Sequence, residues 1–204
     1  MTDKDDIDDE EEELKVILVG EMGTGKTSLI NTAIGLKFQE KLASTTTNSI
    51  VNKVMKINGK SYSINLWDTI GQEKYRSLTK MFFKDSSIVI LVYDITSEKS
   101  FTELNYWYNQ IVNELGNQGY ILAVVGNKKD LFKQEKVNEA KGKEFAKAKN
   151  AKFKLSSAKE DPLSFNTFLE QIFAEFINNN KDILDNKKGQ SITNAKGKKK
   201  GKCC

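Results

Sequence analysis

The sequence lacks any apolar run close to the roughly 18 residues that a membrane-spanning helix needs. Its acidic start lacks the character of a secretory signal or a transit peptide. The two cysteines, Cys203 and Cys204, are the last two residues, so no disulfide can staple a core. With 29% charged and 38% hydrophobic residues in a chain of 204, these features predict a soluble, cytosolic protein with one domain and tails.

Charge is nearly balanced overall, at +4, but it is distributed unevenly along the chain. Residues 1–13 carry nine acidic side chains against one lysine, Lys4, and we expect them to form a disordered tail. Residues 181–204 carry eight lysines against two aspartates, and the apolar periodicity fades just before them. We therefore expect a folded domain over residues 14–178 and a flexible basic tail over residues 179–204.

Short, β-branched apolar runs at residues 14–20, 88–94 and 120–126 are typical of strands buried on both faces of a parallel sheet, and residues 153–157 are expected to form the last strand. Helix-length amphipathic stretches such as 101–115 and 140–149 separate them, which predicts an α/β fold. Asn58-Gly59 lies between two further apolar runs and signals a two-residue hairpin. The sequence thus predicts a mixed, six-stranded, mainly parallel sheet flanked by helices.

The last helix is expected to begin at Pro162, with Asp161 as its N-cap. Apolar residues recur in it at helical spacing and are interpreted as core positions. They are Phe165, Phe168, Leu169, Ile172, Phe173 and Phe176.

The stretch GEMGTGKTS, at residues 20–28, follows a predicted strand and precedes a predicted helix, and it fits the phosphate-loop pattern G-x-x-x-x-G-K-[ST]. Backbone N–H groups of such a loop bind phosphate oxygens, Lys26 reaches the terminal phosphates, and the Thr27 hydroxyl ligates Mg²⁺. The phosphate-binding residues expected here are Gly20, Gly23, Thr24, Gly25, Lys26, Thr27 and Ser28. The loop alone does not distinguish ATP from GTP.

GNKKD, at residues 126–130, provides a preference for guanine, because the Asp130 carboxylate can accept both the ring N–H and the exocyclic amine of that base. Asn127 and Lys128 belong to the same motif, and SSAK, with Ser157, Ala158 and Lys159, is interpreted as a second loop beside the base. In LWDTIGQE, three residues are expected to act on the phosphates. They are Asp68, which reaches Mg²⁺ through water, Gly71, which donates its N–H to the γ-phosphate, and Gln72, which orients the attacking water.

These four motifs, in this order and spacing, resemble a small GTPase of the Ras superfamily, and LVYDIT, WDTIGQEKYRSLT and the paired terminal cysteines are most similar to the Rab family. The resemblance implies a switch threonine on Mg²⁺ at Thr45, with Thr46 and Thr47 as alternatives one or two residues away. It implies that Phe38 packs against guanine. It also implies a hydrophobic triad read by partner proteins, at Ile50, Trp67 and Phe82.

The terminal stretch KGKKKGKCC combines lysines with two thiols, and the resemblance implies geranylgeranylation of Cys203 and Cys204. Two lipid chains make a stable anchor where one gives only marginal binding, and the lysines favour an anionic leaflet. No aromatic residues alternate with these lysines, so nucleic-acid binding is not expected. The alternative is a solvated tail with incidental cysteines.

The sequence therefore predicts a Mg²⁺-dependent, monomeric GTPase that hydrolyses GTP slowly to GDP and regulates vesicular traffic. We expect it on the cytoplasmic face of an endomembrane, with a cytosolic pool. The implied partners are an exchange factor, an activating protein, an escort or dissociation-inhibitor protein, and effectors. Two alternatives remain: a kinase or ATPase with the same phosphate loop, and a GTP-binding module with little or no hydrolysis. The resemblance implies that Met22 lies beside the γ-phosphate with Ile70 across the same space, and the two are hypothesised to slow hydrolysis.

Overall fold

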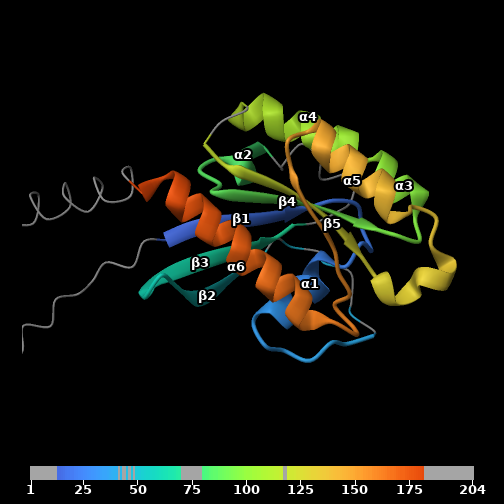
Figure 1. Cartoon of the computed structure of the whole chain (residues 1–204), viewed down its shortest axis with the longest axis horizontal. Coiled ribbons are helices and arrows are strands. Elements are labelled where there is room, and N and C mark those ends of the chain that lie inside the picture. Colours follow the sequence, from blue (N-terminus) through green and yellow to red (C-terminus); the bar gives the residue numbers. More distant parts are fainter. Residues whose placement is uncertain are drawn as a thin grey trace, which may run out of the picture.

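A six-stranded sheet forms the centre of the computed structural model, which describes residues 13–40, 42, 45, 47, 49–69, 80–116 and 119–181 (Figure 1). The strand order is β2-β3-β1-β4-β5-β6. The strands are β1 (Glu13–Val19), β2 (Ser49–Ile57), β3 (Lys60–Asp68), β4 (Ile88–Asp94), β5 (Ile121–Asn127) and β6 (Lys152–Leu155). Among the six strands described, β2 and β3 pair antiparallel, and the other pairs of neighbours are parallel. The predicted α/β class and the mixed, mainly parallel sheet are confirmed.

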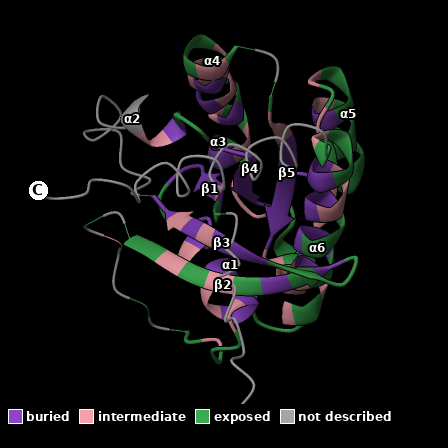
Figure 2. Ribbon diagram, turned by 90° about the vertical axis from the view of Figure 1, so that its left-hand side faces the viewer, coloured by how far each residue is buried: buried purple, intermediate pink, exposed green. Residues whose placement is uncertain are grey.

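Helices cover both faces of this sheet, and Figure 2 shows their buried sides turned toward the strands. On one face, α1 (Lys26–Ala33) and α6 (Pro162–Asn179) pack over a core cluster that contains Leu18 and Ile90. On the other face, α4 (Leu104–Leu115) and α5 (Glu139–Ala148) pack over a second cluster that contains Trp107 and Tyr93. The remaining helices are short: α2 (Lys80–Phe83), α3 (Glu98–Thr102) and the 3₁₀ helix η2 (Lys129–Gln134).

The β2–β3 hairpin turns at Asn58 and Gly59, as predicted. Their φ angles are 52° and 82°, the left-handed values that a type I′ turn requires at both central residues. This turn lies at the end of the sheet where β3 begins, and Asn58 donates a hydrogen bond to Asn178 near the end of α6, at 3.5 Å. The hairpin and the last turn of α6 are therefore neighbours.

The predicted helix over residues 101–115 is divided in the structure. Ser97 accepts a hydrogen bond from the Ser100 N–H as an N-cap, so the helical segment begins earlier than predicted, at Glu98. Glu103 separates α3 from α4, although its φ and ψ of −67° and −12° stay in the helical region. The second predicted helix, over residues 140–149, is α5 and lies within one residue of its predicted position.

Helix α6 begins as predicted, because the Asp161 carboxylate accepts a hydrogen bond from the Ser164 N–H and Pro162 occupies the first turn. All six apolar residues of its predicted stripe are buried. Glu13 already belongs to β1 and Asn179 still belongs to α6, so the folded part extends one residue beyond the predicted domain at each end. The rest of both predicted tails, apart from Asn180 and Lys181, lies outside the described residues. None of the helices in the described part of the chain combines the length and apolar composition that crossing a membrane requires.

Candidate functional site: a nucleotide pocket

A pocket of about 430 Å³ lies at the carboxyl ends of the parallel strands, where open α/β sheets bind their ligands. Segments far apart in the sequence meet around it: the loop after β1, the segment after α1, the end of β5 and the loop after β6. Most of the predicted site residues line it. They are Gly23, Gly25, Lys26, Thr27, Ser28, Phe38, Thr45, Asn127, Lys128, Asp130, Ala158 and Lys159.

The phosphate loop uses glycine where the backbone approaches other strands closely. Gly20 has a φ of 149°, and a Cβ there would overlap the Val92 carbonyl of β4. Gly25, with a φ of 90°, stands directly before α1, and a Cβ there would overlap the Asn127 side chain. Larger residues at these two positions would push the loop away from β4 and β5, where the predicted base-binding residues begin.

Lys26 is the first residue of α1, and its side chain folds back over the loop. Its Nζ donates to the Gly20 carbonyl at 2.8 Å and to the Glu21 carbonyl at 3.0 Å. Burial lowers the pKa of Lys26 from 10.5 to about 8, against the opposing effect of the Asp68 and Glu21 carboxylates. A phosphate group in the loop would supply the negative charge that this buried ammonium needs.

Three oxygen-bearing side chains meet beside Lys26. Thr27 Oγ1 donates to Asp68 Oδ2 at 2.7 Å and lies 2.8 Å from Thr45 Oγ1. The pKa of Asp68 is raised by burial, and the hydrogen bond from Thr27 opposes this effect. Its second oxygen, Oδ1, is buried and has no hydrogen-bond partner among the described residues. Hydroxyl and carboxylate oxygens with spare capacity fit Mg²⁺, which binds hard oxygen ligands and keeps several waters.

Thr45, the first of the candidate switch threonines, therefore has its hydroxyl beside a predicted metal-binding residue, Thr27. Thr47 is exposed, and Thr46 lies outside the described residues. Three further predicted or discussed positions, Ile70, Gly71 and Gln72, also lie outside the described residues, so their roles stay predictions.

Asn127 joins the base side of the pocket to the phosphate loop. Its Nδ2 donates to the Thr24 carbonyl at 2.9 Å, and its Oδ1 accepts from the Ala158 N–H at 3.3 Å. The residue is 2% exposed, so both hydrogen bonds are shielded from water. One amide therefore fixes three loops relative to one another.

Asp130 and Ser157 also meet, as the motifs predict. Ser157 Oγ donates to Asp130 Oδ1 at 2.6 Å and accepts from the Glu160 N–H at 2.9 Å. Ser157 thus holds one oxygen of Asp130, and Asp130 and Phe38 both line the pocket. Lys159 forms an ion pair with Glu40 at 2.9 Å, which connects this loop to the segment after α1.

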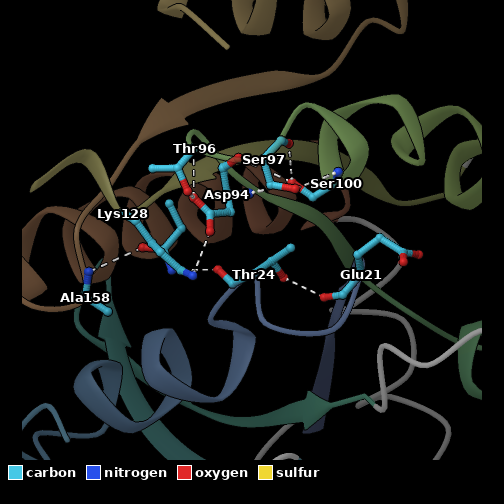
Figure 3. Close-up of polar contacts among 9 residues, drawn as sticks. Glu21, Thr24, Asp94, Thr96, Ser97, Ser100, Lys128 and Ala158 are labelled. Carbon is cyan, nitrogen blue, oxygen red and sulfur yellow. Dashed lines mark hydrogen bonds and ion pairs between the residues drawn. The ribbon is translucent and has the colours of Figure 1, made fainter. Parts of the chain in front are cut away.

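Asp94 is a residue beside the site to which the sequence interpretation gave no role. It ends β4, and its Oδ2 forms an ion pair with Lys128 Nζ at 2.7 Å (Figure 3). The sequence held a signal for this role, because Asp94 and Asn127 each end a buried strand. The structure pairs these two residues in register.

The predicted partner-reading triad also comes together. Ile50 of β2 pairs with Trp67 of β3, and the Trp67 and Phe82 rings lie 5.7 Å apart. Ile50 is 53% exposed, and Lys15 Nζ lies 4.2 Å from the centre of the Trp67 ring. Trp67 thus lies next to both of the other two, as the cross-strand partner of Ile50 and in ring contact with Phe82.

Residues 15–181 match the sequence model of the Ras family, and the chain belongs to this family of small GTPases. Among its relatives, the Ras-related protein Rab-21 of Geodia cydonium is 39% identical over 156 residues, which cover 76% of this chain and 68% of the relative. The Ras-related protein RabC of Dictyostelium discoideum is 35% identical over 202 residues, covering 95% and 100%. The Ras-related protein SEC4 of Saccharomyces cerevisiae is 34% identical over 197 residues, covering 94% and 91%. The resemblance to Ras-superfamily small GTPases close to Rab is confirmed.

Proposed function

We propose that this protein is a membrane-anchored switch that binds GTP, hydrolyses it to GDP and regulates vesicular traffic. The observation that carries the proposal is the convergence of the predicted phosphate, metal and base residues on one pocket, with Asn127 tied to both the phosphate loop and the second base loop. Family membership and Rab relatives support the same proposal.

Guanine selectivity would come from Asp130, held in place by Ser157 at 2.6 Å. A carboxylate accepts from two guanine donors that adenine lacks, and two charge-assisted bonds give roughly 10²-fold discrimination or more. This arrangement argues against an ATPase or kinase. Asp130→Asn should therefore weaken GTP binding and favour xanthosine triphosphate, with Asp85→Asn, an exposed position where asparagine tolerates the φ of 60°, as the control. Unchanged GTP affinity in Asp130→Asn would reject the base assignment.

In the proposed reaction the loop N–H groups and Lys26 hold the phosphates, and Thr27, Thr45 and Asp68 are the residues that would hold Mg²⁺. The ion supplies charge neutralisation on the phosphate oxygens when it is bound. Gln72, by resemblance, orients the attacking water. Unaided hydrolysis should be slow, on the order of 10⁻⁴ s⁻¹, which implies an activating protein as well as an exchange factor.

Hydrolysis is separated from mere binding by a single-turnover experiment with GTP labelled in the γ-phosphate. We expect slow, Mg²⁺-dependent release of labelled phosphate from the wild-type protein and a further loss in Gln72→Leu. If the wild-type protein binds GTP and releases no phosphate, the non-hydrolysing alternative is correct.

Attachment to the cytoplasmic face of an endomembrane is proposed through geranylgeranyl groups on Cys203 and Cys204. In this proposal the lysines before them favour an anionic leaflet, an escort or dissociation-inhibitor protein maintains a cytosolic pool, and effectors read the triad of Ile50, Trp67 and Phe82. The exposed apolar surface of Ile50 beside the Trp67–Phe82 pair supports this last role.

A further inference from the structure

We propose that Asp94 is a positioning residue for the nucleotide: its carboxylate holds Lys128 in place as part of the pocket wall and thereby slows nucleotide release. The inference rests on the proposed function of the pocket. It starts from the ion pair of 2.7 Å between Asp94 Oδ2 and Lys128 Nζ, in which the carboxylate side chain is 10% exposed and the lysine side chain 34% exposed.

The Asp94 carboxylate is itself held rigidly. Its Oδ1 accepts from both the N–H and the hydroxyl of Thr96, each at 2.8 Å. Its backbone N–H donates to Ser100 Oγ at 3.1 Å, and its carbonyl accepts from the Ser97 N–H at 2.9 Å. Figure 3 shows Thr96, Ser97 and Ser100 gathered around Asp94. One carboxylate oxygen is therefore fixed by the turn that leads into α3, and the other is left for Lys128.

The backbone of Lys128 has an uncommon conformation. Its φ of 65° and ψ of 36° place a non-glycine residue in the left-handed region, between the buried Asn127 and the base-binding Asp130. The β4–β5 register pairs Asp94 with Asn127, so the anchor stands at the same strand end as the lysine that follows Asn127. An anchored ammonium keeps the flexible stem of Lys128 against the pocket, where the free side chain would rotate toward solvent.

If Lys128 is already ordered before the nucleotide binds, binding loses no conformational entropy of this side chain. Preorganisation of this kind mostly lengthens the lifetime of the nucleotide complex. Asp94→Asn preserves the size of the side chain and the Oδ1 that Thr96 binds, but it removes the negative charge facing Lys128. We expect this variant to release GDP about tenfold faster, from the usual strength of a charge-assisted hydrogen bond reduced for partial exposure.

A double-mutant cycle on the release of fluorescent GDP tests the proposal. The variants are Asp94→Asn, Lys128→Met and the double variant. If Asp94 acts through Lys128, the double variant should release GDP as fast as Lys128→Met alone. Release by Asp94→Asn within twofold of the wild-type protein, or an equal acceleration in the Lys128→Met background, would overturn the proposal.

A second variant and a matched control separate an effect on GDP release from a folding defect. Thr96→Val removes one of the bonds to Oδ1 and keeps the ion pair, so it should speed release about threefold, and this effect should disappear in the Lys128→Met background. Glu175→Gln is the matched control, because the Lys152–Glu175 ion pair has the same 2.7 Å distance on α6 and β6. It should leave release unchanged, and the circular dichroism spectra of the two GDP-bound variants should match that of the wild-type protein, which excludes a folding defect.

The proposed function and this inference fail in different ways. A wild-type protein that binds no guanine nucleotide contradicts the proposed function. A wild-type protein that binds GDP, with no coupling between Asp94 and Lys128, contradicts only the inference. Single-turnover cleavage of GTP already bound should be unchanged in Asp94→Asn, because Asp94 is argued to act on retention and not on the reacting phosphate.

Discussion

Met22 is an apolar side chain in the phosphate loop that the core does not use. It is 57% exposed and lines the nucleotide pocket. The family resemblance predicts that it lies beside the γ-phosphate, where its bulk would crowd Gln72, the predicted catalytic residue. We predict that Met22→Gly raises the single-turnover hydrolysis rate several-fold without weakening GTP binding, and that adding Ile70→Ala raises it further.

The control for this prediction is Leu36→Gly, since Leu36 is similarly exposed, at 55%, and does not line the pocket. Measured by release of labelled phosphate, Leu36→Gly should leave the rate unaltered. An unchanged or lower rate in Met22→Gly would show that the methionine does not limit cleavage.

Lys26 gives a prediction about pH. Without nucleotide, burial lowers its pKa to about 8, so near that pH roughly half of the molecules carry a neutral Lys26. Bound phosphates favour the charged form and raise the pKa again, so binding must take up protons. Calorimetry of GDP binding in buffers with different ionisation enthalpies should therefore show uptake of about half a proton at pH 8 and less at pH 7. No proton uptake, or the same uptake at pH 7 and pH 8, would contradict a lowered pKa of Lys26 in the nucleotide-free protein.

At the scale of single residues, the motifs predicted which side chains lie together in the pocket, and the hydrogen bonds of Asn127, Asp130 and Thr27 connect them. This was predictable because each motif is one short loop, within which the spacing of the residues is fixed. Asp94 was missed because its partner, Lys128, comes from the neighbouring strand end, and a single strand pattern does not reveal which charges the sheet places side by side.

Helix α6 carries the prediction that belongs to the elements. The Asp161 carboxylate accepts from the Ser164 N–H at 3.2 Å and caps the first turn, and the Asp161 N–H donates to the Ser157 carbonyl at 3.0 Å. Asp161→Ala should lower the free energy of unfolding by about 1 kcal/mol, measured by urea unfolding of the GDP-bound protein. Asp161→Asn, which retains an accepting oxygen, should lose much less, and an equal loss in both variants would argue against the cap.

The strands and helices were largely predictable, because buried parallel strands and amphipathic helices leave different periods in the sequence. The turn at Asn58-Gly59 was predictable because few residues tolerate its φ angles. The earlier start of α3 depends on one capping contact, from the Ser100 N–H to Ser97, and its separation from α4 at Glu103 leaves no mark in the hydrophobic pattern. Periodicity thus predicts the elements better than their ends.

For the whole molecule, the proposed lipid anchor predicts where the protein is found in a cell. Replacing both Cys203 and Cys204 by serine should move the protein from membranes to the soluble fraction of a cell that prenylates proteins, while GTP binding stays unchanged. A single replacement should leave weaker, reversible attachment, because one lipid chain binds only marginally. Imaging and fractionation of a tagged protein check this, and membrane attachment that persists without both thiols would contradict the lipid anchor.

The position of the end of α6 determines how a molecule anchored through its C-terminal tail would be oriented relative to the membrane. Helix α6 starts beside the base loop and runs for 18 residues, about 27 Å, to the hairpin turn at the other end of the sheet, where Asn178 meets Asn58. Strand β1 begins at that same end. A chain tethered to a membrane from the end of α6 would have its nucleotide pocket facing away from that membrane. An exchange factor could then reach the pocket from solvent without passing between the protein and the lipid.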